Sequence, residues 1–289
     1  MPYCQVDGRG AHYREMGEAG RGETVLLLHA GATSSAHWRK VAPSLQGRFH
    51  LVAPDLIGFG ETEAWGRACE PTHDDQAALA AGVAGHAASG PVHVVGHSFG
   101  GAVAVRLALR CPALIKSLVL IEPVLVPLLR QAGETALFEA ERDLARAFIA
   151  DAVASRSVSA WRRFMDHYNG DGTWEALSGN ARYRFLSMTR ETADAYRANL
   201  NNPTRLQDLR TIVRPTLLIW GARTTETYRR ICQILSDHLP NASVLELAGA
   251  GHMSPLTHPD VIARAVGQHV EGPDAAARQR TGFETRDAA

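Results

Sequence analysis

A serine between two glycines is the residue in this sequence best placed to do chemistry. The segment Gly96-His97-Ser98-Phe99-Gly100 follows an apolar run and precedes a helical pattern. So sharp a turn from strand to helix forces its central residue to positive φ, and the small flanking residues avoid backbone clashes. The turn exposes the Ser98 hydroxyl beside the free N–H groups of the helix. We therefore predict that Ser98 is a nucleophile and not merely a helix-capping serine.

The segments around this turn alternate between buried strands and helices. Continuous apolar runs at 24–29, 51–55, 91–96, 117–122, 215–221 and 243–247 predict strands, and 3–6 and 12–15 predict two short strands before them. Helical patterns at 36–45, 74–88, 100–110, 227–238 and 259–270 separate these runs. This alternation predicts an α/β fold, with a mostly parallel sheet and helices on both faces.

Residues 124–205 interrupt the alternation. This stretch has no buried-strand run, and its helical patterns are rich in large apolar residues. We interpret it as a helical insertion over one end of the sheet, which divides the core into residues 1–123 and 206–272. Residues 273–289 are rich in glycine, alanine and charge, and we expect a flexible tail there.

The chain resembles the α/β-hydrolase fold superfamily over about residues 3–270, apart from the insertion. The resemblance rests on the Ser98 turn and on three further motifs, which are Leu28-His29-Ala30-Gly31, Asp55-Leu56-Ile57-Gly58-Phe59-Gly60 and Gly251-His252 with Pro259 following. It implies an eight-stranded sheet and makes the insertion a helical cap over the active site.

The general base follows from this resemblance. A serine hydroxyl needs a base to take its proton, and 13 histidines compete for that role. The family places the base last in the chain, in a loop after the final strand. The loop Ala248-Gly249-Ala250-Gly251-His252-Met253 fits that position, so His252 is the expected base.

The resemblance also implies an oxyanion hole made of backbone N–H groups. One donor is Phe99, the residue after the nucleophile, and the other comes from the loop after the 24–28 run. The common family pattern there is His-Gly and then the donor. This chain reads His29-Ala30-Gly31, which puts Gly31 in the donor position unless it is a plain turn glycine.

The acid departs from the common family pattern. Most members carry an aspartate three residues after the glycine that ends the 215–221 run, but here that residue is Thr224. Glu122 ends the 117–122 run, and the carboxyl end of that predicted strand lies at the same sheet edge as Ser98. We expect Glu122 to orient His252, with Glu226 as the alternative acid.

A narrower likeness points toward the substrate. Zearalenone-type lactone hydrolases are similar to this chain in four features, namely Glu122, the absence of the later aspartate at Thr224, His252 in its loop, and the pair His258-Pro259. This likeness implies a lactone or a bulky ester. Candidate substrate-binding residues are Trp161, Phe164, Met165, Trp174 and Met253, although apolar stripes in helices usually form core.

Composition excludes several other classes of protein. The 289 residues are 45% hydrophobic, and 30 basic residues balance 30 acidic ones, which argues against a nucleic-acid partner. No apolar run reaches the ~20 residues of a membrane span, and the N-terminus lacks a signal-peptide pattern. Cys4, Cys69, Cys111 and Cys232 are scattered, which is typical of reduced thiols in a cytoplasm and not of a metal site.

We therefore expect a cofactor-independent serine hydrolase that acts on small apolar esters or lactones. A serine nucleophile argues against epoxide hydrolases and haloalkane dehalogenases, which in this family use an aspartate. A C–C bond hydrolase of diketone-like substrates, an acyltransferase, a hydroxynitrile lyase and a non-catalytic ligand-binding protein remain as alternatives. The oligomeric state stays open, a homodimer included.

Overall fold

The computed structural model describes residues 2–20, 22–66 and 71–272, where eight strands form a single sheet. Their order is β1-β2-β4-β3-β5-β6-β7-β8. The pairs β1–β2 and β2–β4 are antiparallel and the others are parallel. The predicted α/β fold with a mostly parallel, eight-stranded sheet is confirmed. The tail expected at 273–289 lies outside the described residues. The strands span β1 (Tyr3–Val6), β2 (Arg9–Met16), β3 (Thr24–Leu28), β4 (His50–Pro54), β5 (Val92–His97), β6 (Ile115–Ile121), β7 (Thr216–Gly221) and β8 (Ala242–Leu247).

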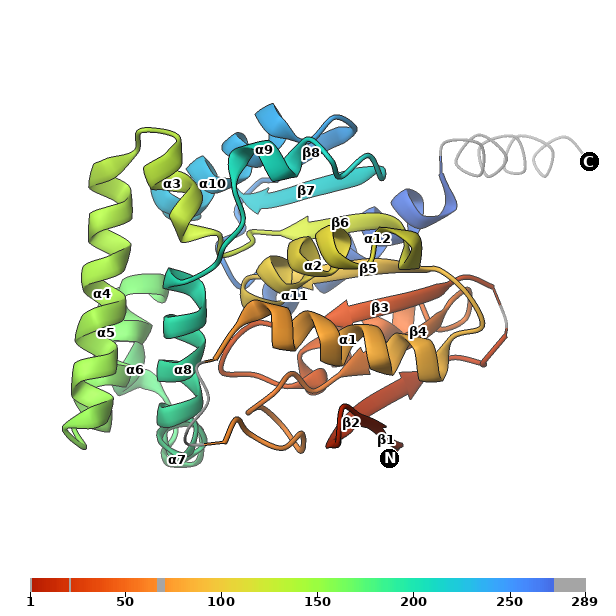
Figure 1. The fold of residues 1–289 in the computed structure, drawn as a ribbon. Coiled ribbons are helices and arrows are strands. Elements are labelled where there is room, and N and C mark those ends of the chain that lie inside the picture. The colour runs from red at the N-terminus through yellow and green to blue at the C-terminus, as the bar shows by residue number, and fades with distance from the viewer. Residues whose placement is uncertain (1, 21, 67–70, 273–289) are drawn as a thin grey trace, which may run out of the picture.

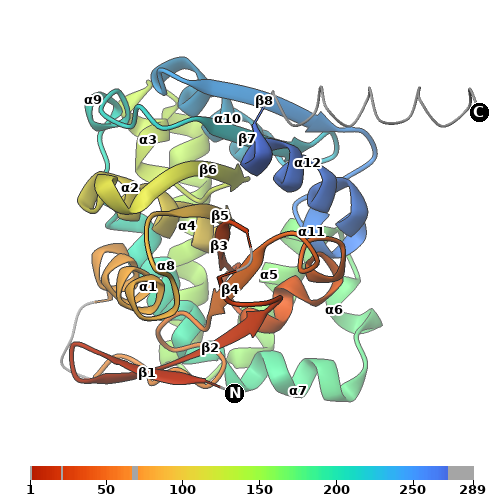
Figure 2. The ribbon, with the colours of Figure 1, turned by 90° about the vertical axis from the view of Figure 1, so that its right-hand side faces the viewer.

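Helices cover both faces of the sheet (Figures 1 and 2). On one face lie α1 (His73–Ala87), α2 (Phe99–Arg110) and α10 (Glu226–His238), and on the other lies α12 (Pro259–Glu271). Each face has its own apolar core. Within β3, Leu26 and Leu28 pack in the core on the α1, α2 and α10 face, while Val25 and Leu27 pack in the core on the α12 face, and all four are fully buried. Burial on both faces explains why this run is continuously apolar. None of the helices in the described part of the chain is long and apolar enough to cross a bilayer.

The segment 36–45 differs from the single helix that we expected. It forms two 3-10 helices, η1 (Ser35–Lys40) and η2 (Ala42–Ser44). The Ser34 side chain caps η1 by accepting a hydrogen bond from the N–H of Ala36. Pro43 has no N–H to donate to a preceding carbonyl, so an α-helical ladder cannot run through η2.

Between β6 and β7 the chain forms seven helices, α3–α9, and we call the first six, α3–α8, the cap. The cap stands beyond the carboxyl ends of the parallel strands (Figure 1) and has an apolar core of its own, centred on Phe148 and Trp161. Its helices are α3 (Val126–Gln131), α4 (Thr135–Val153), α5 (Ser157–Asn169), α6 (Thr173–Ala176), α7 (Gly179–Ser187) and α8 (Thr189–Leu200). Besides η1 and η2, three further short helices lie outside the cap, namely η3 (Pro112–Leu114), α9 (Leu206–Leu209) and α11 (Ser254–Thr257).

A buried carboxylate holds together the loops that follow β3 and β4. Asp55 accepts hydrogen bonds from the N–H groups of Ser35 (2.6 Å) and Glu61 (2.9 Å) and from Nδ1 of His12 (2.6 Å). Burial by itself raises the pKa of Asp55, but the two N–H groups lower it overall. Gly60 has φ 59°, and a Cβ there would lie 2.1 Å from Asp55 Oδ2. Only glycine fits at that position.

Two buried histidines should make stability depend on pH. Burial lowers the pKa of His73 to about 4 and that of His97 to about 3, from an ordinary value of 6.5. At a pH between the lowered pKa and the ordinary one, each of these histidines is protonated in the unfolded chain and neutral in the folded chain, so the unfolded chain binds more protons. The free energy of unfolding should therefore fall as pH drops below the ordinary value, by up to ~1.4 kcal/mol per pH unit for each histidine.

Urea unfolding between about pH 7 and about pH 5 measures this dependence. We expect His73→Gln to flatten the slope, because the substituted side chain no longer titrates. His86 lies on the same helix and is exposed, so His86→Gln is the matched control and should keep the wild-type slope. An unaltered slope in His73→Gln would assign the pH dependence to other groups.

Candidate active site

Ser98 lies at a sharp turn between β5 and α2. Its backbone has φ 54° and ψ −116°, a strained conformation for any residue with a side chain. A Cβ on Gly96 would lie 2.4 Å from the carbonyl oxygen of Gly100, and one on Gly100 would lie 2.3 Å from that of Leu28. The glycines are thus required for close backbone packing, as the sequence predicted.

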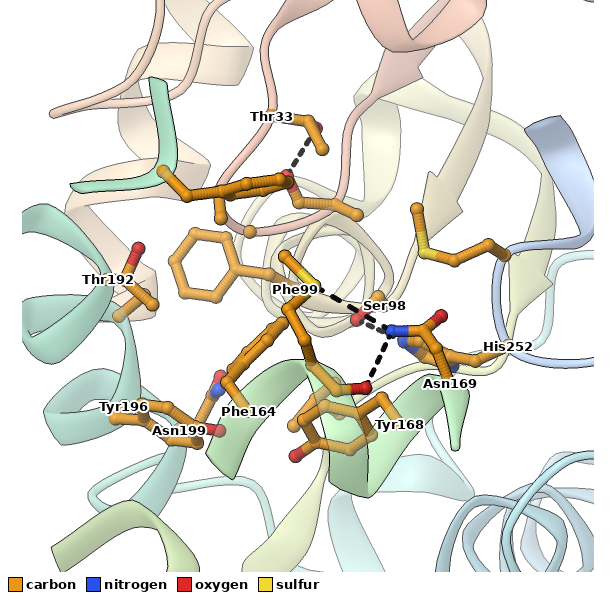
Figure 3. Close-up of a pocket in the computed structure, with 18 of the residues that line it drawn as sticks. Thr33, Ser98, Phe99, Phe164, Tyr168, Asn169, Thr192, Tyr196, Asn199 and His252 are labelled. Atoms are coloured by element: carbon orange, nitrogen blue, oxygen red, sulfur yellow. Dashed lines mark hydrogen bonds between the residues drawn. The ribbon is translucent and has the colours of Figure 1, made fainter. Parts of the chain in front are cut away.

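His252 links this serine to a buried carboxylate. Its Nε2 lies 3.0 Å from Ser98 Oγ (Figure 3), and its Nδ1 lies 2.7 Å from Glu122 Oε2. An ionised carboxylate can only accept, so Nδ1 carries the ring proton and Nε2 accepts from the Ser98 hydroxyl. This tautomer is the one that a general base requires.

Glu122 follows β6 directly and is fully buried, with φ 42°. Its Oε1 accepts the N–H of Gly221 at 2.8 Å, and its Oε2 also accepts the hydroxyl of Thr224 at 2.6 Å. Burial alone raises the pKa of Glu122, but the hydrogen bonds from His252, Thr224 and Gly221 lower it overall. Thr224, where the resemblance led us to look for an aspartate, instead donates to the carboxylate of the neighbouring strand.

The alternative acid is not at the site. Glu226 is the first residue of α10, and its side chain is exposed to solvent. The structure brings Glu122 and not Glu226 to the imidazole. The strand order explains this result, because β6, which ends just before Glu122, lies between β7 and the strand β5 that ends just before Ser98.

The two expected oxyanion donors lie side by side. Phe99 begins α2, so its N–H has no carbonyl partner within the helix. Gly31 lies in the loop after β3, where a Cβ would come within 3.6 Å of the Phe99 Cβ. Both residues line the cavity above the nucleophile. Thr33 fastens the Gly31 loop by donating to the carbonyl of Ala30 at 2.6 Å (Figure 3).

A cavity of about 300 Å³ opens above Ser98 (Figure 3). Its wall is mostly apolar and comes from the loop after β3, from cap helices α5 and α8, and from the His252 loop. Phe164, Met165 and Met253, which we expected to bind substrate, belong to this lining.

Trp161 and Trp174 are instead buried in the cap core, which corrects our expectation that they line the cavity. They are 0% and 2% exposed. The Trp161 ring packs edge-on against Phe148 at 5.3 Å, and its Nε1 donates to the Thr189 hydroxyl at 3.0 Å. Both rings hold the cap helices together, the ordinary role of an apolar stripe.

Two stacked histidines hold the backbone of the His252 loop. His97 Nε2 donates to the carbonyl oxygen of His252 at 2.8 Å, and His97 Nδ1 lies 3.0 Å from His37 Nε2. Since His97 donates through Nε2, its Nδ1 accepts from His37 when both rings are neutral. Burial lowers the pKa of both histidines, which keeps them neutral. Sequence reasoning gave His97 only a packing role.

Two tyrosines that sequence reasoning did not assign to the site flank the imidazole. The Tyr228 ring stacks on His252 at 4.6 Å, with the Tyr168 ring at 5.8 Å. Tyr228 donates to the Tyr168 hydroxyl at 3.1 Å, and Tyr168 donates to Glu141 at 3.3 Å. Tyr228 comes from α10 and Tyr168 from cap helix α5, so their hydroxyl bond joins the cap to the core of the fold, and their rings contact His252. A tyrosine in a helical pattern carries no signal for such a role.

No group of three or more His, Cys, Asp and Glu side chains in the described residues is placed to hold a metal ion.

Known proteins resemble this chain over nearly its whole length. The model of the alpha/beta hydrolase family matches residues 25–265. An uncharacterized hydrolase, YugF of Bacillus subtilis, is 26% identical over 92% of this chain and 96% of its own. The 2-hydroxymuconate semialdehyde hydrolase of a Pseudomonas species is 26% identical over 90% and 91%. The solved enol-lactonase of Burkholderia xenovorans superposes with a TM-score of 0.70 at 21% identity, covering 94% of this chain and 100% of its own.

We expect Glu122→Gln to lower kcat/KM on an activated aryl ester by roughly 10⁴-fold, because the amide cannot stabilise the imidazolium. Glu226→Gln should stay near wild type, since Glu226 is exposed at the start of α10. Circular dichroism would verify that both variants fold. A larger loss in Glu226→Gln than in Glu122→Gln would move the acid to position 226.

His97→Leu should lower kcat by roughly 10- to 100-fold with little change in KM, because the His252 loop loses its hydrogen-bond anchor. His97→Gln retains an N–H donor and should recover part of the loss. Steady-state kinetics on the same aryl ester separates kcat from KM. Equal losses in both variants, or a change in KM alone, would remove His97 from this positioning role.

Proposed function

Because this chain belongs to the alpha/beta hydrolase family, we propose that it is a serine hydrolase of carboxylic esters or lactones that works through an acyl-enzyme. The observation that carries the proposal is the hydrogen-bond chain Ser98–His252–Glu122, with distances of 3.0 and 2.7 Å. Acyl transfer by a serine needs hydrogen bonds in this order, from the nucleophile to the base and from the base to the acid, which supports the proposal.

The proposed reaction begins when Ser98 Oγ attacks the substrate carbonyl while His252 Nε2 takes the hydroxyl proton. Negative charge then develops on the carbonyl oxygen, where the N–H groups of Gly31 and Phe99 would stabilise it. The tetrahedral intermediate collapses, and His252 returns the proton to the leaving alcohol. Water, deprotonated by His252, then attacks the acyl-enzyme and releases the acid.

The cavity favours a neutral, largely apolar substrate. Among the described residues that line it, none is lysine, arginine, aspartate or glutamate. A carboxylate on the substrate would therefore enter without a counter-charge, at a cost in desolvation. An uncharged ester meets no such penalty. The same holds for a lactone, including a bulky or macrocyclic one, whose leaving alcohol stays attached to the acyl group after the ring opens.

C–C bond hydrolysis of diketone-like substrates is the second candidate. The similarity to 2-hydroxymuconate semialdehyde hydrolase over 90% of the chain favours it, and it uses the same three catalytic side chains. The uncharged cavity wall favours esters and lactones instead, since the name of that relative's substrate denotes a carboxylate.

We expect a fluorophosphonate to form a covalent adduct with Ser98, visible as a mass shift of the intact protein, because His252 activates this hydroxyl. Ser98→Ala is the matched control and should show no shift. Absence of an adduct on the wild type, or an equal adduct on Ser98→Ala, would contradict the proposal and leave a ligand-binding protein as the better interpretation.

A hydrolysis panel separates the two candidate reactions. It would compare short esters, aryl esters, macrolactones and vinylogous diketones, with Ser98→Ala as the blank. Turnover of esters or lactones above diketones supports the proposal, and the opposite ranking assigns the protein to C–C bond hydrolysis.

A further inference from the structure

One face of cap helix α8 carries polar side chains on the wall of the mostly apolar cavity. Thr192, Tyr196 and Asn199 are spaced four and three residues apart and so lie on one side of the helix. All three line the cavity. Their exposed fractions are 4%, 6% and 8%, so bulk water hardly reaches them.

These side chains hold polar atoms without partners. Thr192 Oγ1, the Tyr196 hydroxyl and Asn199 Oδ1 have no described residue within the distance and angle of a normal hydrogen bond. The nearest polar groups are the side chain of Tyr168 for Tyr196 and that of His73 for Asn199. A buried polar atom left unpaired costs folding free energy, and native proteins rarely place three of them on one helix face. Because bulk solvent is excluded, the partner that can reach them is a group that enters the cavity.

Their position separates them from the catalytic centre. In Figure 3 the three side chains lie on the far side of the Phe99 and Phe164 rings from Ser98 and His252. A substrate whose carbonyl reaches Ser98 thus passes two aromatic rings before it meets the α8 face. The cavity has a reactive end, an apolar middle and a polar end.

We propose that Thr192, Tyr196 and Asn199 form a subsite for a neutral hydroxyl group at the end of the substrate remote from the scissile carbonyl. This inference rests on the proposed function and specifies its substrate class, an apolar ester or lactone with a distal alcohol or phenol. The Thr192 and Tyr196 hydroxyls can donate to the substrate oxygen, and Asn199 Oδ1 can accept its proton.

The chemistry of the subsite argues against a charged group. A carboxylate can only accept, so it would leave Asn199 Oδ1 unpaired and its own charge without a counter-ion. An ammonium group would find no acidic side chain among the described lining residues. A hydroxyl is both donor and acceptor and satisfies both kinds of atom.

The test compares the p-nitrophenyl esters of two straight-chain acids of equal length, one ending in a methyl group and the other in a hydroxyl. The measured quantity is the ratio of kcat/KM for the hydroxyl ester to that for the methyl ester. We expect Tyr196→Phe to lower this ratio about tenfold, which corresponds to about 1.4 kcal/mol. Thr192→Val and Asn199→Leu should lower it in the same direction.

Two matched controls remove a hydroxyl elsewhere. Thr173 lines the cavity, but its hydroxyl already donates to the Gly170 carbonyl at 2.6 Å. Tyr183 is 73% exposed. Thr173→Val and Tyr183→Phe should keep the wild-type ratio. A ratio that Tyr196→Phe and Thr192→Val leave unchanged would overturn the subsite, while continued hydrolysis of both esters would leave the proposed function intact.

The melting temperature Tm gives a second measurement, because a merely structural role of these hydroxyls would lower the Tm of the variants and a role in binding would not. Tyr196→Phe and Thr192→Val remove unpaired buried hydroxyls, so their Tm should equal or exceed that of the wild type. A lower Tm in both would mean that the hydroxyls serve folding, and it would overturn the proposal.

If neither ester is hydrolysed, the proposed function fails separately from the subsite. The same two esters would then be tested as ligands of Ser98→Ala by the shift in Tm. A larger shift for the hydroxyl ester, lost when Tyr196→Phe is added, supports the subsite, and equal shifts overturn it.

Discussion

The buried carboxylate of Glu122 sets where the surrounding elements must lie. A buried charge without partners costs several kcal/mol, and this carboxylate receives three hydrogen bonds from two other segments, through Gly221 and Thr224 at the end of β7 and through His252. The register of β6 and β7, which pairs Ile121 with Ile219, places Gly221 beside it. The β8–α11 loop then brings the imidazole to its remaining face. The ionised Glu122 side chain can therefore be buried only if the β6–β7 register and the length of the β8–α11 loop bring its partners to it.

Backbone strain gathers at the same edge of the sheet. Five non-glycine residues in the described part of the chain have positive φ, and three of them, Ala32, Ser98 and Glu122, follow parallel strands at the site. Such conformations cost about 1–3 kcal/mol each. The strands β3, β5 and β6 before them are almost wholly buried, so packing over their length holds the strained ends in place. A rigid sheet with strained ends suits a reaction that needs fixed donors.

The sequence predicted what depends on local rules and missed what depends on the meeting of distant side chains. The clash that a Cβ on Gly96 would make lies within five residues, at Gly100, and apolar runs indicate strands buried on both faces, so both could be predicted. Glu122 could be inferred because parallel strands end at one edge. The roles of Thr224, Tyr228 and His97 could not, because each depends on a partner from another segment. Trp161 and Trp174 were wrongly expected at the cavity, because an apolar stripe on a helix does not indicate whether it faces the cap core or the cavity.

The bond between Thr224 and Glu122 bears on how such sites can change over evolutionary time. A hydroxyl at position 224 and a carboxylate at position 122 lie 2.6 Å apart, so the ends of β6 and β7 hold two adjoining side chains next to the oxygen that accepts from His252. An ancestor with carboxylates at both positions would share one proton between them, because two like charges at that separation do not both ionise. Either acid could then be lost while the histidine kept its anchor. A descent through such a doubly acidic intermediate would carry the charge from one strand to the next without passing through an inactive protein.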